Sequence, residues 1–472
     1  EGVTQKEVEE FYREKKKQNE LISWGLNSTL VRDEQGRLRE EVWYVGGKYS
    51  KELTRVVENL EKAAEYACNE HQKEIIDLLV QYYRTGDLAL FDRYSIEWVK
   101  ESAAPVDFIN GFIEVYGDPL AYKASWESVV QIMDEEACKR TRKLADNALW
   151  FERNAPIDER FKKSEVVGII ARVVQAAMLG GDCHPATPIG INLPNAEWIR
   201  ERYGSKSVTL DNITYAYNQT SLTSGVLDEF AYSEEEKELV RKYGYLGGNV
   251  HTDLHECLGH GSGKMLPGVG QEALKNYYST IEETRADLFA LYYVMDPKLV
   301  ELGVVPSLDV AKSEYCNYIR NGLMVQLTRV KLGNNLEESH MRNRQLIASW
   351  VYEKGKASNV IERVVRDGKT YFTIRDYDAL RQLFGKLLAE IQRVKSEGDF
   401  EGARNLIEGY GVRIDPVLHQ EVLERYRKLN VAPYAGFVNP EYKLVEKEGN
   451  ITDVEITYPT DFLAQMLEYG NI

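Results

Sequence analysis

Three stretches of the chain place apolar residues three and four positions apart, the spacing of a helix with one buried face. The first stretch follows Ser50, a residue type that caps helices, and runs from residue 53 to residue 67. The second runs from residue 75 to residue 83 and is stopped by Gly86. The third runs from residue 383 to residue 394 and ends near Gly398. These patterns predict a chain that is predominantly helical.

Strand patterns are fewer. Residues 364–374 form two short runs around Asp367-Gly368, the signature of a β-hairpin with a tight turn. Near the C-terminus, Val454, Ile456 and Tyr458 alternate with polar residues and predict another strand. Together these patterns predict an α+β protein in which helices dominate. No repeat or low-complexity linker marks a domain boundary.

The charge balance argues against some partners. The 472 residues carry a formal net charge of −16, from 75 acidic and 59 basic side chains. This balance disfavours binding to nucleic acids or anionic membranes, which require clustered lysine and arginine. It is compatible with a site that attracts cationic ligands, such as a peptide with a free N-terminal ammonium group.

The cysteines and the chain start bear on localisation. The five cysteines are scattered, odd in number and contain no C-x-x-C pair, so we expect a reducing, cytoplasmic setting. No apolar run has the length of a membrane span. The chain starts without methionine or a signal-peptide pattern, and an upstream targeting segment would be invisible here.

The segment His255-Glu256-Cys257-Leu258-Gly259-His260 carries the clearest chemistry. Two imidazoles bind zinc, and a glutamate directly after the first accepts a proton from the zinc-bound water. Five residues on a regular helix correspond to about 500° of rotation, which points the imidazoles roughly 140° apart. Both can face one metal only if the helix contains an extra residue as a bulge. We expect Gly259 to make this distortion inexpensive.

A third protein ligand is expected, with the fourth position left to water. We choose Glu283, on a stretch whose apolar positions from Ile281 to Met295 predict a helix with a buried side. Asp287 lies one turn after Glu283 on the same face, where it could orient a ligand imidazole. The sequence thus predicts one Zn²⁺ per chain, held by His255, His260 and Glu283.

Other interpretations of nearby residues were weighed. His251 and His255 are four apart and form a rival ligand pair, but that choice leaves Glu256 and Gly259 without a role. Residues 261–264 resemble the end of a phosphate loop but lack its glycine spacing and its final Ser or Thr, so we reject that reading. Cys183 beside His184 is better explained as a loop cysteine than as a nucleophile.

The two motifs together resemble the paired signature of the dipeptidyl peptidase III family, HExxGH followed by EExRA[ED]. Further segments that are similar to the family follow in family order, so the resemblance extends over essentially the whole chain. They are residues 111–119, 190–195, 340–344 and 427–429. The short segment 261–281 between the two motifs indicates a bacterial-type member.

The resemblance implies an exopeptidase that releases dipeptides from the N-terminus of short oligopeptides. An exopeptidase must hold the substrate ammonium at a fixed distance from the metal. The matching segments imply that Glu114 pairs with this ammonium and that Glu127 belongs to the same pocket. Asn192 and Asn195 are implied to hydrogen-bond the backbone of the first substrate residues.

The resemblance also assigns groups around the scissile bond. Tyr116 and His340 are implied to donate hydrogen bonds to the oxyanion of the tetrahedral intermediate. Arg344, Arg427 and Lys428 are implied to bind the downstream backbone or carboxylate of the peptide.

The implied architecture has two lobes around a wide cleft. The mixed lower lobe, with part of a β-barrel, is expected in residues 1–134, 176–226 and 427–472. The helical, zinc-bearing upper lobe is expected in residues 135–175 and 227–426. Family members usually carry an N-terminal region ahead of the part seen here, so we expect this chain to lack it. We expect a monomer.

Two alternatives to a dipeptidyl peptidase stay open. One is a broader zinc aminopeptidase or oligopeptidase, which the metal motif alone does not distinguish. The other is a peptide-binding protein without activity, against which the intact Glu256 argues, because a binder has no use for a base beside the metal.

Overall fold

The computed structural model describes residues 2–115, 117, 118, 120–166, 172–184, 187–431 and 437–470. The chain divides into two compact units. Unit 1 comprises Glu1–Glu135, Arg172–Ile213 and Tyr434–Ile472, and unit 2 comprises Glu136–Ala171 and Thr214–Pro433. Each unit has a hydrophobic core of its own.

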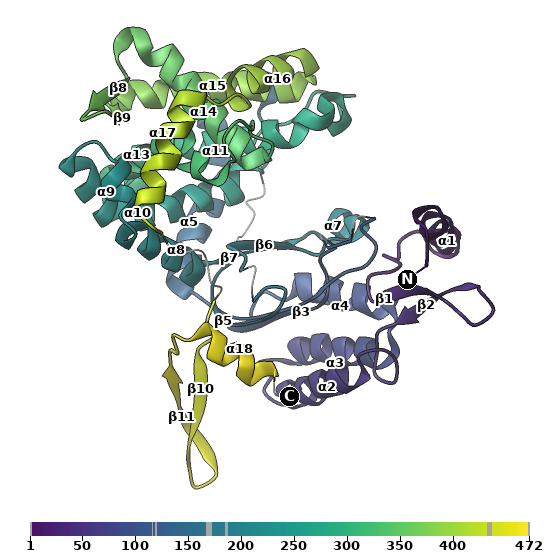
Figure 1. Ribbon diagram of the computed structural model, residues 1–472. Coiled ribbons are helices and arrows are strands. Elements are labelled where there is room, and N and C mark those ends of the chain that lie inside the picture. The colour runs from purple at the N-terminus through teal and green to yellow at the C-terminus, as the bar shows by residue number, and fades with distance from the viewer. Residues whose placement is uncertain are drawn as a thin grey trace. The chain divides into compact units, whose positions relative to one another are not determined.

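Unit 1 combines helices with a mixed sheet (Figure 1). Its elements are α1 (Gln5–Gln18), β1 (Ser28–Arg32), β2 (Leu38–Val42), α2 (Ser50–Ala64), α3 (Glu70–Thr85), α4 (Leu88–Lys100), β3 (Val106–Phe112), β4 (Trp126–Met133), β5 (Arg172–Gly181), β6 (Gly190–Leu193), α7 (Glu197–Tyr203), β7 (Lys206–Leu210), β10 (Glu441–Lys447), β11 (Asn450–Thr457) and α18 (Phe462–Gly470).

The main sheet of unit 1 has the strand order β3-β4-β5-β7-β6. Its neighbours are antiparallel except for β5 and β7, which run parallel. β3 and β6 form the two ends, so the strands that the structure describes leave the sheet open. Helices α2, α3 and α4 share one core with this sheet through residues such as Leu79, Trp98 and Val129.

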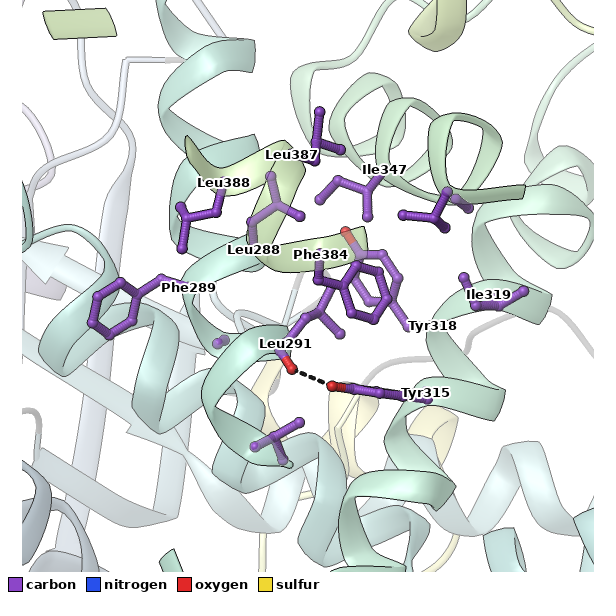
Figure 2. Packing of buried hydrophobic residues seen from close by; sticks show 14 of the residues in the cluster. Leu288, Phe289, Leu291, Tyr315, Tyr318, Ile319, Ile347, Phe384, Leu387 and Leu388 are labelled. Carbon is purple, nitrogen blue, oxygen red and sulfur yellow. Dashed lines mark hydrogen bonds between the residues drawn. The ribbon is translucent and has the colours of Figure 1, made fainter. Parts of the chain in front are cut away.

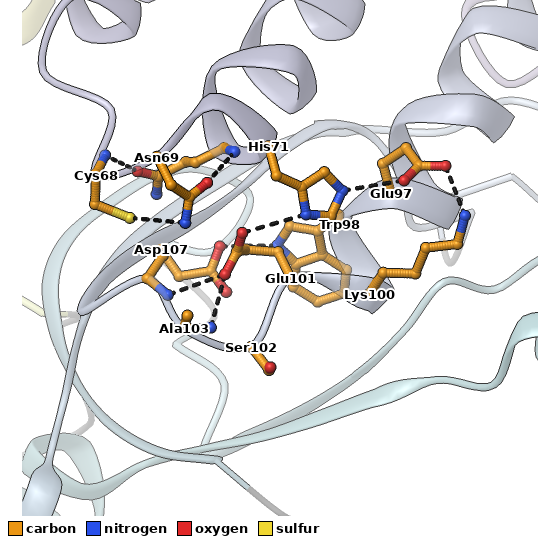
Figure 3. Close-up of polar contacts among 12 residues, drawn as sticks. Cys68, Asn69, His71, Glu97, Trp98, Lys100, Glu101, Ser102, Ala103 and Asp107 are labelled. Carbon is orange, nitrogen blue, oxygen red and sulfur yellow. Dashed lines mark hydrogen bonds and ion pairs between the residues drawn. The ribbon is translucent and has the colours of Figure 1, made fainter.

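A buried carboxylate joins the sheet of unit 1 to α4. Asp107 on β3 accepts hydrogen bonds from the Trp98 indole at 3.0 Å, from Arg172 at 2.9 Å and from Lys206 at 2.9 Å. Figure 3 shows the Trp98 contact beside the polar residues at the end of α4. Burial lowers the pKa of Lys206 to about 8, although Asp107 opposes this shift. One carboxylate thus balances two buried cations and fixes β3, β5, β7 and α4 together.

The regular structure described in unit 2 is helical apart from one hairpin. Its elements are α5 (Glu135–Asp146), α6 (Ala148–Asn154), η1 (Glu159–Phe161), α8 (Asp211–Thr223), α9 (Val226–Phe230), α10 (Glu234–Leu254), η2 (His255–Gly259), η3 (Gln271–Tyr277), α11 (Tyr278–Val294), α12 (Pro297–Glu301), α13 (Asp309–Leu323), η4 (Val325–Arg329), α14 (Ser339–Gly355), η5 (Lys356–Ser358), β8 (Ile361–Arg366), β9 (Lys369–Ile374), α15 (Tyr377–Glu397), α16 (Phe400–Leu406), η6 (Ile407–Gly411) and α17 (Pro416–Lys428), with α5 and α8 reaching across the unit boundary.

Helix α11 is the centre of unit 2. It packs against α10, α14 and α15, and its Leu288 and Leu291 are completely buried. Figure 2 shows these leucines among Ile347 of α14 and Phe384 of α15, with the Tyr315 hydroxyl donating to the Leu291 carbonyl at 2.7 Å. A helix surrounded in this way is rigid, and it carries the Glu-Glu-Thr-Arg-Ala-Asp motif.

Most of the predicted elements are present. Gly86 ends α3 with φ 73°, and Gly398 ends α15 with φ 66°, both in the left-handed conformation that favours glycine. The predicted hairpin is formed by β8 and β9, with positive φ at both Asp367 and Gly368. The predictions of an α+β class and of a mainly helical chain are confirmed.

One local prediction was wrong by a residue. Tyr49, with φ 60°, is the N-cap of α2, and Ser50 is its first helical residue. The Ser50 hydroxyl accepts a hydrogen bond from the Gly46 amide at 2.8 Å, so it stabilises the preceding turn instead of the helix start. A serine between a turn and a helix can accept a hydrogen bond from an amide of the turn or from an amide of the first helical turn, and the local sequence does not show which one it accepts.

None of the helices among the described residues combines the length and the apolar character needed to cross a bilayer. None of the five cysteines forms a disulfide bond.

The Asp107 cluster generates a stability prediction. Replacing Asp107 by Asn leaves Arg172 and Lys206 buried without a counter-charge, so we expect the free energy of unfolding to fall by at least about 3 kcal/mol. Denaturant unfolding measures the change. The control, Asp77→Asn, breaks the exposed ion pair with Lys73 and is expected to leave the unfolding midpoint unchanged. Equal midpoints for both variants would contradict this account.

Candidate metal centre

The two histidines of the HExxGH motif are brought together by a local change of helix type. Helix α10 passes into a single π-helical turn, His255–Gly259, in which the His260 amide donates to the His255 carbonyl at 3.0 Å. The predicted bulge is therefore confirmed. The Nε2 atoms of His255 and His260 lie 3.1 Å apart. Two nitrogens bound tetrahedrally at the usual zinc–nitrogen distance would be separated by about 3.3 Å.

Gly259 has a different role from the expected one. Its φ lies outside the left-handed region, so the bulge does not depend on glycine's conformational freedom. A Cβ atom at Gly259 would instead lie 3.0 Å from both the Cα and the carbonyl oxygen of Ala286 on α11. Glycine is needed because the π-turn and α11 pass in close contact. This approach places the imidazoles beside the carboxylates of α11.

Helix α11 supplies the expected third group. Oε2 of Glu283 lies 3.3 Å from Nε2 of His255 but makes no hydrogen bond, although it is buried. Burial alone would raise the pKa of Glu283, but the neighbouring imidazoles, His255 first, hold it below its usual value. One atom from each of His255, His260 and Glu283 lies within 4.8 Å of the others. Two imidazole nitrogens and one carboxylate oxygen form the donor set of catalytic zinc sites, so these residues fit such an ion.

The remaining ring nitrogens of both histidines face carboxylates. Nδ1 of His255 lies 2.7 Å from Oδ1 of Asp287, the contact that an orienting role for Asp287 requires. Nδ1 of His260 lies 2.9 Å from Oε1 of Glu282. Each carboxylate fixes the tautomer and the plane of its imidazole, which leaves both Nε2 atoms free to bind a cation.

Sequence reasoning missed the role of Glu282 and of its partners. Glu282 accepts from Arg285 at 2.6 Å and from Lys395 at 2.5 Å, and these cations hold its pKa far below the usual range against the effect of burial. Arg285 is completely buried and also donates to the carbonyls of His260 and Ser262. The sequence did contain a signal for this role, the Glu282-Glu283 doublet. If Glu283 binds the metal, the neighbouring Glu282 is available to accept the hydrogen bond from Nδ1–H of the second histidine.

His251, the rival ligand, is placed differently. Its Nε2 lies 3.1 Å from Oδ1 of Asp287, and its Nδ1 lies 3.1 Å from Oε1 of Glu314. His251, His255 and Asp287 form a second group close enough to hold a metal. However, Asp287 Oδ1 lies between the two imidazoles, and each nitrogen of His251 lies 3.1 Å from a carboxylate oxygen.

Glu256 lies on the π-turn directly after His255. Its side chain is partly exposed, and within the described ranges its carboxylate makes no hydrogen bond or ion pair. Its charge nevertheless acts on the His255 imidazole. An unengaged carboxylate next to the metal ligands is in a position to accept a proton.

Helix α14 contributes His340 to the same region. Glu338 caps this helix by accepting hydrogen bonds from the amides of His340 and Met341. Nδ1 of His340 lies 3.6 Å from Oε2 of Glu283, and 59% of its side chain is exposed. Arg344, one turn later, donates to the side chain of Gln326 at 3.1 Å.

The other predicted substrate contacts of unit 2 lie outside this cluster. Arg427 and Lys428 are exposed in the last turn of α17. Their positive charges interact favourably with the negative end of the helix dipole at this position. No contact between them and the cluster is present among the described residues. Tyr116 lies outside the described residues.

In unit 1, two of the predicted residues meet. The Asn195 side chain donates to Oε1 of Glu114 at 3.1 Å. Both residues line a cavity of about 330 Å³ whose other walls are mainly apolar and aromatic, among them Phe91 and Trp98. Among the described residues that line it, the acidic ones are Asp92 and Glu114, and none is lysine, arginine or histidine. A mainly apolar cavity that contains acidic groups suits a cation attached to an apolar group.

The other two predicted substrate-binding residues of unit 1, Glu127 and Asn192, lie on strands of the main sheet. Burial raises the pKa of Glu127 on β4 to about 7, with a further contribution from the charge of Glu114, while a hydrogen bond from the Cys183 thiol opposes the shift. Asn192 on β6 is exposed and donates to the Ser207 hydroxyl at 2.9 Å.

Fold and site together define a two-unit protein whose helical unit contains an imidazole–carboxylate cluster that could hold a metal ion. The model of peptidase family M49 matches residues 24–277 and 270–451, which is most of the chain. The chain belongs to peptidase family M49.

Two curated relatives and one solved structure illustrate the similarity. Dipeptidyl peptidase 3 of Mus musculus is 28% identical over 454 residues, covering 86% of this chain and 60% of that protein. Dipeptidyl peptidase 3 of Homo sapiens is 27% identical with the same coverage. A solved structure of DPP III from Caldithrix abyssi has 24% identity and a TM-score of 0.74, covering 91% of this chain and 78% of that one. The chain thus spans about 60% of the length of these curated relatives.

The contact at Gly259 generates a packing prediction. Gly259→Ala places a methyl group against the Ala286 backbone, so we expect the free energy of unfolding of the metal-free protein to fall by about 1–3 kcal/mol. The matched control is Gly248→Ala on α10, where an added Cβ would meet no atom within 4 Å. That variant should gain up to about 1 kcal/mol from helix propensity. Denaturant unfolding with a chelator present measures both, and a stabilised Gly259→Ala would contradict the close approach.

Proposed function

We propose that the protein is a zinc-dependent dipeptidyl peptidase that releases dipeptides from the N-terminus of short oligopeptides. The observation that carries the proposal is the convergence of His255 Nε2, His260 Nε2 and Glu283 Oε2, with the unengaged Glu256 beside them. Membership of family M49 supports the same chemistry. The relatives named above are dipeptidyl peptidases, which favours dipeptide release over other peptidase activities.

His255, His260 and Glu283 would hold the zinc ion. When bound there, zinc supplies a Lewis acid that polarises a carbonyl and increases the acidity of water. Glu256 accepts a proton from the water that attacks the scissile carbonyl and passes it to the leaving amine. Asp287 and Glu282 hold the two imidazoles in place through their Nδ1 atoms, so that geometry is set before substrate arrives.

His340 and Tyr116 would donate hydrogen bonds to the oxyanion that forms during attack. The position of His340 beside Glu283, with most of its side chain exposed, supports a role toward substrate. Arg344, Arg427 and Lys428 would bind the downstream part of the peptide through its carbonyls or its carboxylate.

Glu114 would bind the N-terminal ammonium of the peptide, and its hydrogen bond with Asn195 orients the carboxylate for that purpose. Asn192 would bind the substrate backbone, and Glu127, whose pKa burial raises to about 7, would add negative charge to the same region when it is ionised. An uncapped N-terminus is therefore the recognised feature. We further propose that the bound ion is zinc, that the protein is cytoplasmic and that it is a monomer. The free thiols favour a reducing compartment.

Product analysis tests the proposed reaction. Zinc-loaded protein is incubated with an unmodified pentapeptide and with its N-acetylated twin, with and without a chelator. We expect the N-terminal dipeptide to be released from the free peptide only, and only without chelator. Glu256→Gln should lower the rate by about 10²–10⁴-fold because the proton acceptor is lost, while zinc binding is retained. The exposed Glu301→Gln serves as the control with an unchanged rate.

Other products identify the alternatives. Release of single amino acids would indicate an aminopeptidase, and cleavage of both peptides would indicate an oligopeptidase. Peptide binding without turnover by the zinc-loaded protein would point to a binding protein. Unchanged turnover by Glu256→Gln would overturn the proposed mechanism.

The role of Glu114 makes a separate prediction. Glu114→Gln keeps the size of the side chain but removes the charge that pairs with the ammonium, so we expect kcat/KM for the free peptide to fall by about 10- to 100-fold. Asp77→Asn, an exposed acid of the same unit, is the control. If Glu114→Gln left kcat/KM unchanged, the ammonium would have to be bound elsewhere.

A further inference from the structure

A histidine one turn before the metal ligands is enclosed by acidic and aromatic groups. His251 lies on α10, four residues before His255, and is only 8% exposed. Its Nε2 faces Asp287 Oδ1 and its Nδ1 faces Glu314 Oε1, both at 3.1 Å. Tyr318 stacks on the ring, with centroids 5.5 Å apart and planes inclined by 15°. Elements α10, α11 and α13 therefore meet at this imidazole.

The two polar contacts of His251 differ in kind. Nε2 and Asp287 Oδ1 are within hydrogen-bond distance and geometry at 3.1 Å. Nδ1 lies 3.1 Å from Glu314 Oε1 in a geometry that makes no hydrogen bond. His251 is therefore held in place by the hydrogen bond to Asp287, by the close approach of Glu314 and by the stacked Tyr318 ring.

Asp287 is held from three directions. Its Oδ1 receives His255 Nδ1 at 2.7 Å and His251 Nε2 at 3.1 Å, and its Oδ2 receives the Tyr318 hydroxyl at 2.7 Å. Asp287 can orient the His255 imidazole only if its own carboxylate cannot rotate. His251 and Tyr318 remove that rotation. His251 also separates the buried carboxylates of Asp287 and Glu314.

We propose that His251, Glu314 and Tyr318 form a positioning cluster that acts through Asp287 on His255 and thereby sets the affinity of the site for zinc. The inference rests on the metal site of the proposed function and adds residues that the two-motif signature does not contain. His251 is in this view a positioning residue and not a ligand. Its loss would leave the three ligands in place but allow the His255 ring to turn away from the orientation that zinc requires.

Zinc affinity tests the cluster without reference to peptide cleavage. Competition with a chromophoric chelator gives the zinc dissociation constant of the full chain. His251→Gln keeps an N–H donor but loses the ring that contacts Asp287, Glu314 and Tyr318 together, so we expect zinc binding to weaken by about 10- to 100-fold, the usual effect of losing an outer-shell partner. Tyr318→Phe, which removes one hydroxyl, should weaken binding by a smaller factor.

The pairing of His251 with Glu314 is tested by a double variant. His251→Gln alone leaves the Glu314 carboxylate buried without its partner. In His251→Gln/Glu314→Gln that charge is gone, so we expect part of the lost affinity to return and the two effects to be non-additive. Cobalt(II) absorption of each variant reports whether the ligand geometry has changed.

The chain offers a matched control in unit 1. His71 also lies between two carboxylates, with Nε2 3.0 Å from Glu97 and Nδ1 3.4 Å from Glu101 (Figure 3). His71→Gln makes the same chemical change away from the metal ligands and should leave zinc affinity unchanged. Thermal unfolding of each metal-free variant separates a general loss of stability from a specific loss of zinc binding.

The outcomes are distinct. A weakened zinc constant and an altered cobalt spectrum in His251→Gln, with His71→Gln unchanged, support the cluster. A His251→Gln zinc constant within twofold of the parent overturns it, and so does an equal loss in His71→Gln. Failure of the parent chain to bind zinc would overturn the metal site of the proposed function as well. Failure to cleave peptides with zinc bound would overturn only the proposed activity.

Discussion

The five-position spacing from His255 to His260 is the constraint on which the candidate metal centre depends. A regular helix would direct the two imidazoles to different sides, so the chain must add one residue to a turn before a shared cation becomes possible. The π-turn His255–Gly259 meets this requirement. It also brings Gly259 against the backbone of Ala286, so the same distortion sets the distance between α10 and α11. Ligand geometry and helix packing are therefore a single feature of this fold.

The helical unit also depends on how the buried carboxylates of α11 are balanced by other groups. Glu282, Glu283 and Asp287 lie within two turns of one helix, and each would be costly to bury alone. Arg285 and Lys395 balance Glu282, while Asp287 is hydrogen-bonded to His251 and to the Tyr318 hydroxyl. A metal ion would balance Glu283, whose Oε2 is buried without a hydrogen bond. The rigid apolar surroundings of α11 hold these charges in fixed positions, which gives a site that is organised before any ligand arrives.

In unit 1, too, a buried carboxylate that accepts several hydrogen bonds holds separate elements together. A single carboxylate, Asp107, joins a helix to strands that are distant in sequence by accepting from Trp98, Arg172 and Lys206. The strand that carries Asp107 leads directly to Glu114, and the strand before Asn195 belongs to the same sheet. The meeting of Glu114 with Asn195 thus depends on how the sheet is assembled. Recognition of a substrate ammonium in this unit would rest on a framework stabilised by buried ion pairs.

The sequence by itself determined the features that depend on local spacing. Helices with one apolar face, their glycine ends at Gly86 and Gly398, the Asp-Gly hairpin and the need for a bulge before His260 all follow from residues close together in the chain. The tertiary structure decided which distant groups meet: Glu282 with His260, Ala286 with Gly259, and Asp287 with His251. Apart from the Glu282-Glu283 doublet, no local pattern distinguishes Glu282 from other helical glutamates, and none shows that His251 lies between two carboxylates. These facts arise only when α10, α11 and α13 pack, because side-chain partners across elements are chosen by helix contact and burial and not by position along the chain.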